Sequence, residues 1–300
     1  METLTHLGEI AALLTAIFWT ITALAFESAS IKVGSLSVNV IRLFIALVFL
    51  CIYTFISRGI PFPVDATGYQ WFWLLMSGFV GFVFGDLFLF KSYTVIGSRF
   101  AMLIMTLAPC FAAFLGWLVL GERLTFFNYL GMLLTFVGIA LAVFSKESDT
   151  SKFSLKLSPK GILLAFGGAV GQASGLVLSK LGMQDYDPFA ATQIRIVAGI
   201  FGFSLLVTYL RRWPRVIKAL SHRRAMVGIT TGSFFGPFLG VSFSLLAVQF
   251  TETGIASTIM AIVPVLIIPP AILIYKQKVT WLEAVGALLS ICGVAMFFVK

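Results

Sequence analysis

The stretch "MTLAPCFAAFLGWLVLGERLT" (Met105–Thr125) returns later in the chain as "MAIVPVLIIPPAILIYKQKVT" (Met260–Thr280). The methionine, the proline and the closing threonine keep identical spacing, whereas the Glu-Arg pair has become Gln-Lys with another lysine in front. Each stretch is an almost unbroken apolar run of the length that crosses a bilayer, about 20 residues. The sequence therefore predicts a membrane helix that occurs twice and ends in a corner of changed charge.

The composition places the chain in a lipid environment. Hydrophobic residues make up 59% of the 300 residues and charged residues only 11%, whereas a soluble domain carries about a quarter charged residues. A spanning segment that satisfies its own backbone hydrogen bonds is a helix, so we predict an all-α integral membrane protein with ten transmembrane helices. The ten apolar segments fall at residues 8–27, 37–57, 70–90, 99–120, 125–144, 161–180, 189–210, 225–248, 254–275 and 280–299.

The basic residues lie mainly in the short joints between these segments, which accounts for the net charge of +9 without a nucleic-acid partner. Lys and Arg collect in the cytoplasmic loops of membrane proteins. Their distribution predicts both termini outside, in the plasma (inner) membrane of a prokaryote. Cys51, Cys110 and Cys292 are scattered singly inside apolar segments, a pattern that indicates packing rather than a disulfide or a metal site. We therefore expect no cofactor and no metal.

The two halves of the chain match each other. A shift of 155 residues aligns residues 79–140 with 234–295 without a gap, and a shift of 153 residues extends the match towards the N-terminus. Paired glycines and prolines carry the match, because coincidence explains pairs of such sparse residues poorly. We predict a first five-helix repeat over residues 1–144, a polar linker over 145–160 and a second five-helix repeat over 161–300.

An odd number of spans in each repeat means that the second repeat enters the membrane from the opposite side. Such inverted repeats build many secondary transporters, whose substrate site lies near the midplane between the halves. The inversion also explains the corner: the charges of Glu122 and Arg123 cancel on the outside, whereas Lys276 and Lys278 remain on the cytoplasmic side. The alternative is a duplication that merely enlarged a membrane scaffold.

The residues also resemble a known family. Trp19, the segment "IRLFIALVFL" (Ile41–Leu50) and above all "LAPCFAAFLGWLVLGERLTFFNYLGMLLTFVGIALA" (Leu107–Ala142) are similar to the EamA family of the drug/metabolite transporter superfamily. The resemblance covers nearly the whole chain. It implies a ten-helix, two-repeat carrier of small metabolites, commonly an exporter of amino acids. Gln277 stands where the family usually has an acidic residue, which argues against an essential glutamate at the corner.

The family implies a central cavity lined by the first, third, fourth, sixth, eighth and ninth helices. A pocket of methionine, aromatic and hydroxyl groups suits an amphipathic solute, through flexible apolar contacts and a few orienting hydrogen bonds. The alternative for the hydroxyl groups is a hydrogen bond to their own helix backbone. The candidate substrate-binding residues are Trp19, Thr22, Asp86, Tyr93, Met105, Pro109, Gln172, Ser174, Ser242, Met260 and Pro264.

Asp86 is the most informative candidate. It follows an apolar run deep in the third segment, where a charge is costly and is usually functional or paired. It touches the transport path, where it could take up a coupling proton, or forms a structural pair, or stands at a span end that is shifted outwards. Lys91, five residues later, could neutralise it or lie at the cytoplasmic edge. The repeat equivalent of Asp86 is Val241, so any role is carried by one half alone.

Pro109 and Pro264 occupy matching places in the fourth and ninth segments. A proline removes a backbone donor and bends the helix, which either frees carbonyl groups for a ligand or serves the shape of the helix alone. Glycines spaced four residues apart, at Gly81 and Gly85 and again across residues 228–240, predict close helix packing.

Glu27 and Lys180 stand at equivalent places in the first and sixth segments, where opposite charges could act as gates on opposite sides of the membrane. The alternative is that both side chains snorkel to the interface. Arg42 and Arg195 are expected to snorkel in the same way, although arginine is also suited to binding a substrate carboxylate.

Together these features predict a carrier that works by alternating access, with a small amphipathic metabolite such as an amino acid as its cargo and export as its direction. Transport could be passive or coupled to protons, and a monomer would contain the whole path. A sugar-phosphate or nucleotide-sugar exchanger would place several basic residues inside the cavity, whereas those here lie near segment ends. A membrane enzyme would need a convergent catalytic set and a channel a repeated filter; the sequence shows neither pattern.

Overall fold

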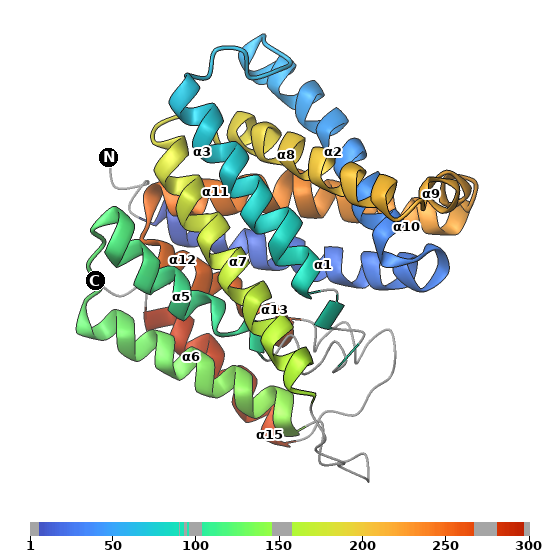
Figure 1. Cartoon of the computed structure of the whole chain (residues 1–300). Coiled ribbons are helices and arrows are strands. Elements are labelled where there is room, and N and C mark those ends of the chain that lie inside the picture. The colour runs from blue at the N-terminus through green and yellow to red at the C-terminus, as the bar shows by residue number, and fades with distance from the viewer. Residues whose placement is uncertain are drawn as a thin grey trace.

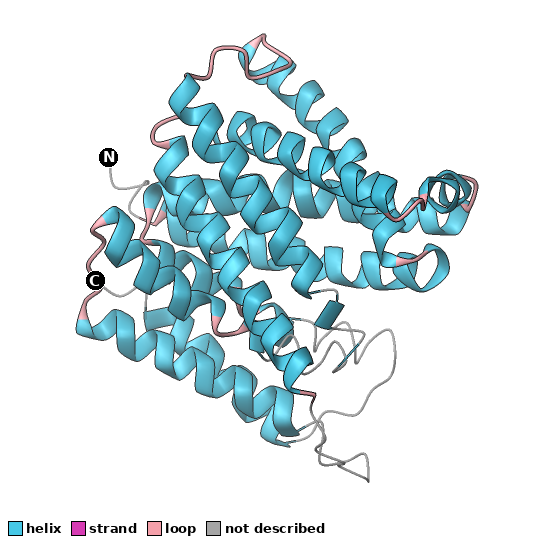
Figure 2. Cartoon of the chain, in the orientation of Figure 1, coloured by secondary structure: helices cyan, strands magenta, loops and turns pink. Residues whose placement is uncertain are grey.

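The computed structural model describes residues 6–89, 91–92, 95, 104–145, 158–266 and 281–296. Throughout these residues the chain consists of helices and connecting loops, without a strand (Figure 2). The helices of the first half, with η marking a π-helix, are α1 Leu7–Val33, α2 Ser35–Arg58, α3 Gly68–Gly78, η2 Phe79–Gly85, α5 Ala108–Leu115, η3 Gly116–Leu120 and α6 Phe126–Ser145. Those of the second half are α7 Pro159–Met183, α8 Pro188–Tyr209, α9 Trp213–Leu220, α10 Arg223–Ser233, η4 Phe234–Gly240, α11 Val241–Phe250, α12 Thr253–Met260, α13 Val263–Leu266 and α15 Trp281–Ala295.

The described helices have the length and surface of membrane spans. Six stretches are long and apolar enough to cross a membrane: Leu7–Ser30, Ser35–Arg58, Gly68–Leu89, Pro159–Met183, Pro188–Tyr209 and Arg223–Phe250. Three shorter apolar helices, Ala108–Leu120, Phe126–Leu141 and Ala284–Ala295, match the predicted fourth, fifth and tenth spans, and α12 and α13 begin the predicted ninth. Large apolar side chains such as Phe55 and Ile56 point outwards, as lipid requires. The chain is an all-helical integral membrane protein.

One face of the molecule, at the left of Figure 1, gathers the start of α1 and the loops 59–67, 121–125, 184–187 and 251–252. We call it the N-terminal face. Hydrogen bonds between side chains connect the loops of this face. Tyr186 of loop 184–187 donates to Asp65 of loop 59–67, and Lys180 of α7 donates to Glu122 of loop 121–125. The helix α2 ends on this face whereas its repeat equivalent α8 begins on it. The two halves therefore run through the membrane in opposite directions, which confirms the predicted inversion.

The contacts between helices repeat when the halves are exchanged. α7 packs along α3 and η2, and α1 correspondingly packs along α10, η4 and α11. α2 packs on α8, and α6 packs on α15 (Figure 1). In the last pair, a Cβ on Gly138 would lie 2.4 Å from the nitrogen of Ser290, and one on the equivalent Gly293 would lie 2.6 Å from that of Thr135. Both glycines let the two backbones meet.

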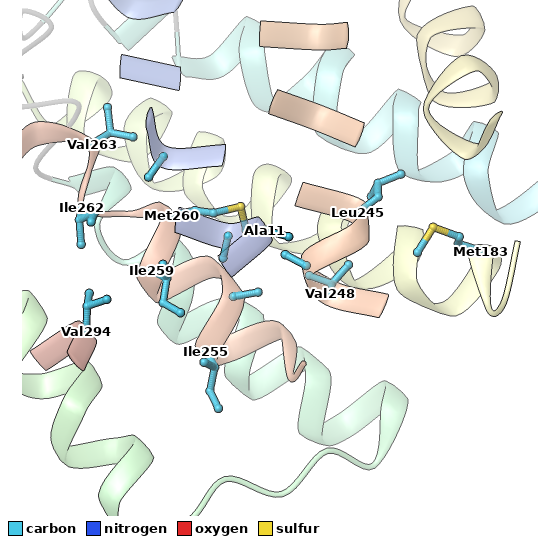
Figure 3. Close-up of a cluster of buried hydrophobic side chains, with 14 of the residues drawn as sticks. Ala11, Met183, Leu245, Val248, Ile255, Ile259, Met260, Ile262, Val263 and Val294 are labelled. Atoms are coloured by element: carbon cyan, nitrogen blue, oxygen red, sulfur yellow. The ribbon is translucent and has the colours of Figure 1, made fainter. Parts of the chain in front are cut away.

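A buried apolar cluster joins α1 to α11, α12 and α13. Met260, at the end of α12, is 3% exposed and lies in this cluster with Ala11 and Ile259 (Figure 3). A second cluster joins α2 and α8 to η4. Helices of the two halves thus meet through buried apolar side chains, and the polar groups between them stand out for that reason.

Candidate functional site

The third helical stretch places a carboxylate inside the membrane. The run "FVGFVFG" forms η2, and Asp86 follows it directly. Asp86 is 7% exposed, and each of its oxygens has a partner. Arg42 Nη2 donates to Oδ2 at 2.5 Å, and Gln172 Nε2 donates to Oδ1 at 2.8 Å. Asp86 therefore links the end of η2 to α2 of its own half and to α7 of the other half.

Arg195 of α8 is the repeat equivalent of Arg42, and it lies beside the same π-helix. It is 5% exposed, and its guanidinium carbon lies 5.0 Å from the centroid of the Phe82 ring. Its Nε is buried without a hydrogen-bond partner among the described residues, and its Nη2 lies beside Gly81, whose carbonyl oxygen accepts a hydrogen bond from Gln172. We call Arg42, Asp86, Gln172 and Arg195 the polar centre.

The polar centre corrects two sequence interpretations. Arg42 and Arg195 do not snorkel: each lies seven residues, about 10 Å, inside its helix, and each turns its guanidinium into the protein. The ion pair of Asp86 in the described chain is with Arg42, rather than with Lys91 in its own helix. Sequence spacing suggested the nearest lysine, but the fold brings the more distant Arg42 of α2 to the carboxylate.

Glycines make room for the polar centre. A Cβ on Gly175 would lie 2.8 Å from the Cα of Gly81, and one on Gly171 would lie 2.8 Å from the Cα of Gly85. α7 and η2 therefore touch backbone to backbone, which brings Gln172 within reach of Asp86. The predicted glycine ridge in the eighth span also allows close helix packing, because Gly232, Gly236 and Gly240 lie against side chains of α1.

The π-helices η2 and η4 occupy equivalent places in the two halves. A shift of 155 residues carries Phe79–Gly85 onto Phe234–Gly240, the bounds of η4. π-helical turns are rare and are often found at functional sites. Pro237 lies inside η4, and Asp86 directly follows η2. Neither π-helix was predicted, because glycine spacing indicates close packing but does not indicate a change in the hydrogen-bond ladder.

Glu122 links the two halves on the N-terminal face. Lys180 Nζ donates to Glu122 Oε1 and to the carbonyl oxygen of Thr251, both at 2.7 Å. The amide and the hydroxyl of Thr253 donate to Glu122 Oε2 at 2.9 and 2.6 Å. Thr253 begins α12, so the carboxylate also meets the free N–H groups of a helix start. We call this set of four residues the Glu122 tie.

The Glu122 tie corrects the sequence interpretation of the repeated corner. The carboxylate of Glu122 is not simply cancelled by its exposed neighbour Arg123, because its partner is Lys180 of the second repeat. The pairing crosses from one repeat to the other, so neither repeat alone could reveal it. A gating role for Lys180 remains a prediction, and the side chain of Glu27, its proposed counterpart, lies outside the described part.

We expect Glu122→Gln to loosen the N-terminal face, because the amide keeps the size of the side chain but loses the charge that holds Lys180. Hydrogen bonds to charged groups contribute about 1.5–3 kcal/mol. A cysteine introduced at Thr251, which is 8% exposed, should then react faster with a membrane-impermeant maleimide in a background without the native cysteines. Arg123→Gln, which changes an exposed neighbour, is the matched control. An unchanged labelling rate in Glu122→Gln would show that the tie does not close this face.

A second cluster holds two further loops of the N-terminal face together. Arg58 pairs with Asp65, and the hydroxyl of Tyr186 donates to Asp65 at 2.8 Å. Burial, reinforced by the Asp65 carboxylate, raises the pKa of Tyr186 to about 12, so the hydroxyl remains a donor at neutral pH. Gln249 adds hydrogen bonds to the carbonyl oxygens of Gln184 and Tyr186.

Several predicted cavity residues contribute to packing in this structure. Thr22 donates to the carbonyl oxygen of Phe18 in its own helix at 2.8 Å, and its methyl group faces Gly236. Trp19 fills the space beside Gly240 in the same way. Ser242 is fully buried and donates to Thr192 at 3.2 Å. Within the predicted set, Asp86 and Gln172 are joined directly by a hydrogen bond.

The remaining predicted residues are placed as follows. Met105 and Ser174 are partly buried, and Lys91 is exposed. Tyr93 and the side chain of Pro264 lie outside the described part. The described residues contain no group of three or more His, Cys, Asp or Glu side chains that could hold a metal ion.

Both predicted prolines follow an interruption of the helix. A turn at residues 106–107 precedes α5, in which Pro109 is the second residue. A turn at residues 261–262 likewise separates α12 from α13, whose second residue is Pro264. Proline suits the first turn of a helix because its missing N–H has no partner there in any case. The interruptions therefore fall at equivalent places in the two halves.

An aromatic groove of about 790 Å³ opens between α2, the start of α8, and η4 with α11. It is lined mainly by Phe49, Tyr53, Phe189, Phe234, Phe238 and Phe243. The equivalent place in the other half is packed tightly: a Cβ on Gly202 would lie 2.3 Å from Val83 Cγ2. Gly202 is the equivalent of Phe49, and Val83 that of Phe238. Both helix pairs are in contact, and the two halves differ in the side chains between them: aromatic rings in one, a glycine against a valine in the other.

The comparisons with known proteins agree with this architecture. A model of the EamA-like transporter family matches residues 6–144 and 159–299. A crystal structure with a TM-score of 0.74 covers 97% of this chain and 95% of that chain at 17% identity, a likeness that shows the fold alone.

Two curated relatives match parts of the chain. The membrane protein YMR253C of Saccharomyces cerevisiae is 30% identical over 116 residues, which are 37% of this chain and 27% of that protein. The transporter YoaV of Bacillus subtilis is 31% identical over 140 residues, which are 46% of this chain and 47% of that protein. The matched segments thus span less than half the length of either relative.

Proposed function

Because the chain belongs to the EamA-like transporter family, we propose that it is a secondary transporter of small amphipathic metabolites, such as amino acids, working by alternating access and exporting its cargo. The observation that carries the proposal is the polar centre, where residues of both halves hold one buried carboxylate. Transporters with inverted repeats bind substrate and coupling ions near the midplane, between the repeats.

The difference between the two halves supports alternating access. An aromatic groove runs along α2 and η4, whereas at the equivalent place in the other half Gly202 of α8 packs directly on Val83 of η2. In an inverted repeat, exchanging these two arrangements opens the opposite face of the molecule. The Glu122 tie joins the halves on the N-terminal face, and it would have to break when that face opens.

Asp86 is the residue through which protons could be coupled to transport. A proton on this carboxylate would remove its ion pair with Arg42 and thereby release α2 from the end of η2. Ionisable residues within membrane helices commonly serve as proton relays. One chain contains the whole polar centre, so a monomer suffices.

The basic residues support an orientation with both termini outside, in the plasma (inner) membrane of a prokaryote. The segment between α8 and α10 lies on the face opposite the N-terminal face (right in Figure 1). It carries Arg211, Arg212, Arg215 and Lys218, and Arg223 and Arg224 follow at the start of α10. Cytoplasmic loops are rich in such residues, which supports the cytoplasm on that side.

The burial of Arg42 and Arg195 keeps a sugar-phosphate or nucleotide-sugar exchanger as a second candidate. The sequence disfavoured it because the basic residues lie near span ends, but these two guanidinium groups are turned inwards. The flux experiment therefore includes sugar phosphates beside amino acids.

The test is uptake into proteoliposomes across a panel of amino acids and sugar phosphates, with and without a pH gradient. We expect saturable flux of at least one amino acid. Asp86→Asn should lower that flux by about ten- to hundredfold, the cost of losing hydrogen bonds to a charged group. Asp185→Asn, at an exposed loop carboxylate, should leave the flux unchanged.

Each outcome bears on a separate part of the proposal. Absence of flux for every amino acid would overturn the amino-acid assignment, and flux of sugar phosphates alone would favour the exchanger. Flux that is identical without the gradient would remove proton coupling. Unimpaired transport by a folded Asp86→Asn variant would show that the carboxylate is not required.

A further inference from the structure

Arg195 is a buried cation without a counter-ion of its own. Within the described part of the chain, the ion pair of Asp86 is with Arg42, and Arg195 forms none. Both oxygens of Asp86 are already engaged, one by Arg42 and one by Gln172. The polar centre thus contains two guanidinium groups and one carboxylate, which leaves one positive charge in excess.

The repeat explains why this charge is left over. Arg42 and Arg195 are equivalent, but the position equivalent to Asp86 is Val241, which is buried and apolar. The first half therefore supplies an anion for its arginine, whereas the second half does not.

An unpaired charge at this depth is costly. Arg195 lies about 10 Å inside α8 at 1.5 Å per residue, in a hydrocarbon core about 30 Å thick. A buried charge without a partner loses several kcal/mol of solvation, even after relaxation of the protein. Charged residues inside membrane segments accordingly pair with one another or mark the path of a substrate or an ion.

The contacts of Arg195 leave a hydrogen-bond donor of its guanidinium unused. The ring of Phe82 lies near the guanidinium carbon and stabilises the charge without neutralising it. Gly81 has no side chain, and a Cβ there would lie 3.4 Å from Nη2 of Arg195. The unpartnered Nε is one of the donors with which arginine binds a carboxylate through two parallel hydrogen bonds.

We infer that Arg195 binds the carboxylate of the transported solute, so that the substrates are small monocarboxylates. The inference rests on the proposed transport function and names its substrate class. A single negative charge neutralises the excess of the polar centre, whereas a phosphate ester brings about two. An ammonium group is not required, because Asp86 is already occupied by residues of the protein.

The test is a binding experiment on the purified full-length chain in detergent. Two matched sets of probes share an apolar skeleton: L-leucine, 4-methylpentanoate and L-leucinamide, and L-phenylalanine, 3-phenylpropanoate and L-phenylalaninamide. In at least one set we expect both carboxylates to bind about tenfold or more tightly than the amide, since a charged hydrogen-bond pair is lost with the carboxylate. Glucose 6-phosphate tests the alternative anion.

Variants then locate the effect. Arg195→Gln should weaken the binding of both carboxylates by about ten- to hundredfold, and Arg195→Lys should retain part of the affinity. Arg215→Gln removes an exposed cation of α9 and should change nothing. If Arg195→Gln does not fold, the Arg195→Lys variant and the comparison of probes on the unmodified chain still test whether Arg195 binds the carboxylate.

The inference is overturned if no carboxylate binds, if the amides or glucose 6-phosphate bind at least as tightly as the carboxylates, or if a folded Arg195→Gln variant binds them unchanged. Failure of the transport function looks different. In that case the carboxylates bind and depend on Arg195, but no member of the panel crosses the proteoliposome membrane.

Discussion

Replacing Arg42 with glutamine is expected to lower the free energy of unfolding by about 3–5 kcal/mol, the cost of removing one partner from a buried ion pair. The two side chains of the pair are 12% and 10% exposed, so water cannot replace the lost guanidinium. Asp86 would keep Gln172 as its hydrogen-bond partner but would lose its counter-charge.

A double-mutant cycle separates this effect from the loss of packing. Arg42→Gln combined with Asp86→Asn removes both charges of the pair, and most of the stability should return because neither partner is left behind without its counter-charge. Thermal unfolding of the purified variants in detergent is the measurement, with Arg215→Gln as an exposed control. If the double variant is as unstable as the sum of the two single variants, the pair contributes nothing to folding.

Replacing Gly175 with alanine is expected to destabilise the protein by about 1–3 kcal/mol, the usual cost of overpacking. The added Cβ would lie 2.8 Å from the Cα and 3.1 Å from the nitrogen of Gly81. A backbone cannot move aside as a flexible side chain can, so α7 and η2 would have to separate. Gly171→Ala should behave in the same way, because its Cβ would meet the backbone of Gly85.

The matched control is Gly68→Ala, at the start of α3, where a Cβ meets nothing within 4 Å. Alanine is intrinsically the better helix former, so this variant should be neutral or slightly stabilised. A common melting temperature for Gly175→Ala and Gly68→Ala would refute the close approach of α7 to η2. The separation should also draw Gln172 away from Asp86, which a flux assay would detect as reduced transport.

The helical spans and their inversion could be predicted from the sequence, because both follow from one-dimensional patterns. A bilayer demands long apolar runs, and five spans in each repeat reverse the second repeat. Asp86 stood out for the same reason, since a charge within such a run is costly. Its partner Arg42 did not, because pairing depends on the direction in which each helix turns its side chains.

The errors share this physical origin. Depth along a helix suggested that Arg42 and Arg195 snorkel, whereas their rotation about the helix axis turns them inwards. Trp19 and Thr22 fill spaces beside the glycines of η4, a contact the sequence did not indicate, and their role in the cavity stays a prediction. Glu122 was taken as a loop charge because its partner Lys180 lies in the other repeat.

The substitution of Val241 for a second aspartate has a thermodynamic consequence. Two identical repeats would give an inward-facing and an outward-facing state that are related by a two-fold axis in the membrane plane and have equal free energy. Here one half holds its arginine with a carboxylate and the other does not, so the two states are no longer degenerate. Each 1.4 kcal/mol of difference changes their ratio about tenfold. Between transport cycles, a carrier of this kind would mainly adopt one of the two states, inward-facing or outward-facing, and a single unmatched residue would cause that preference.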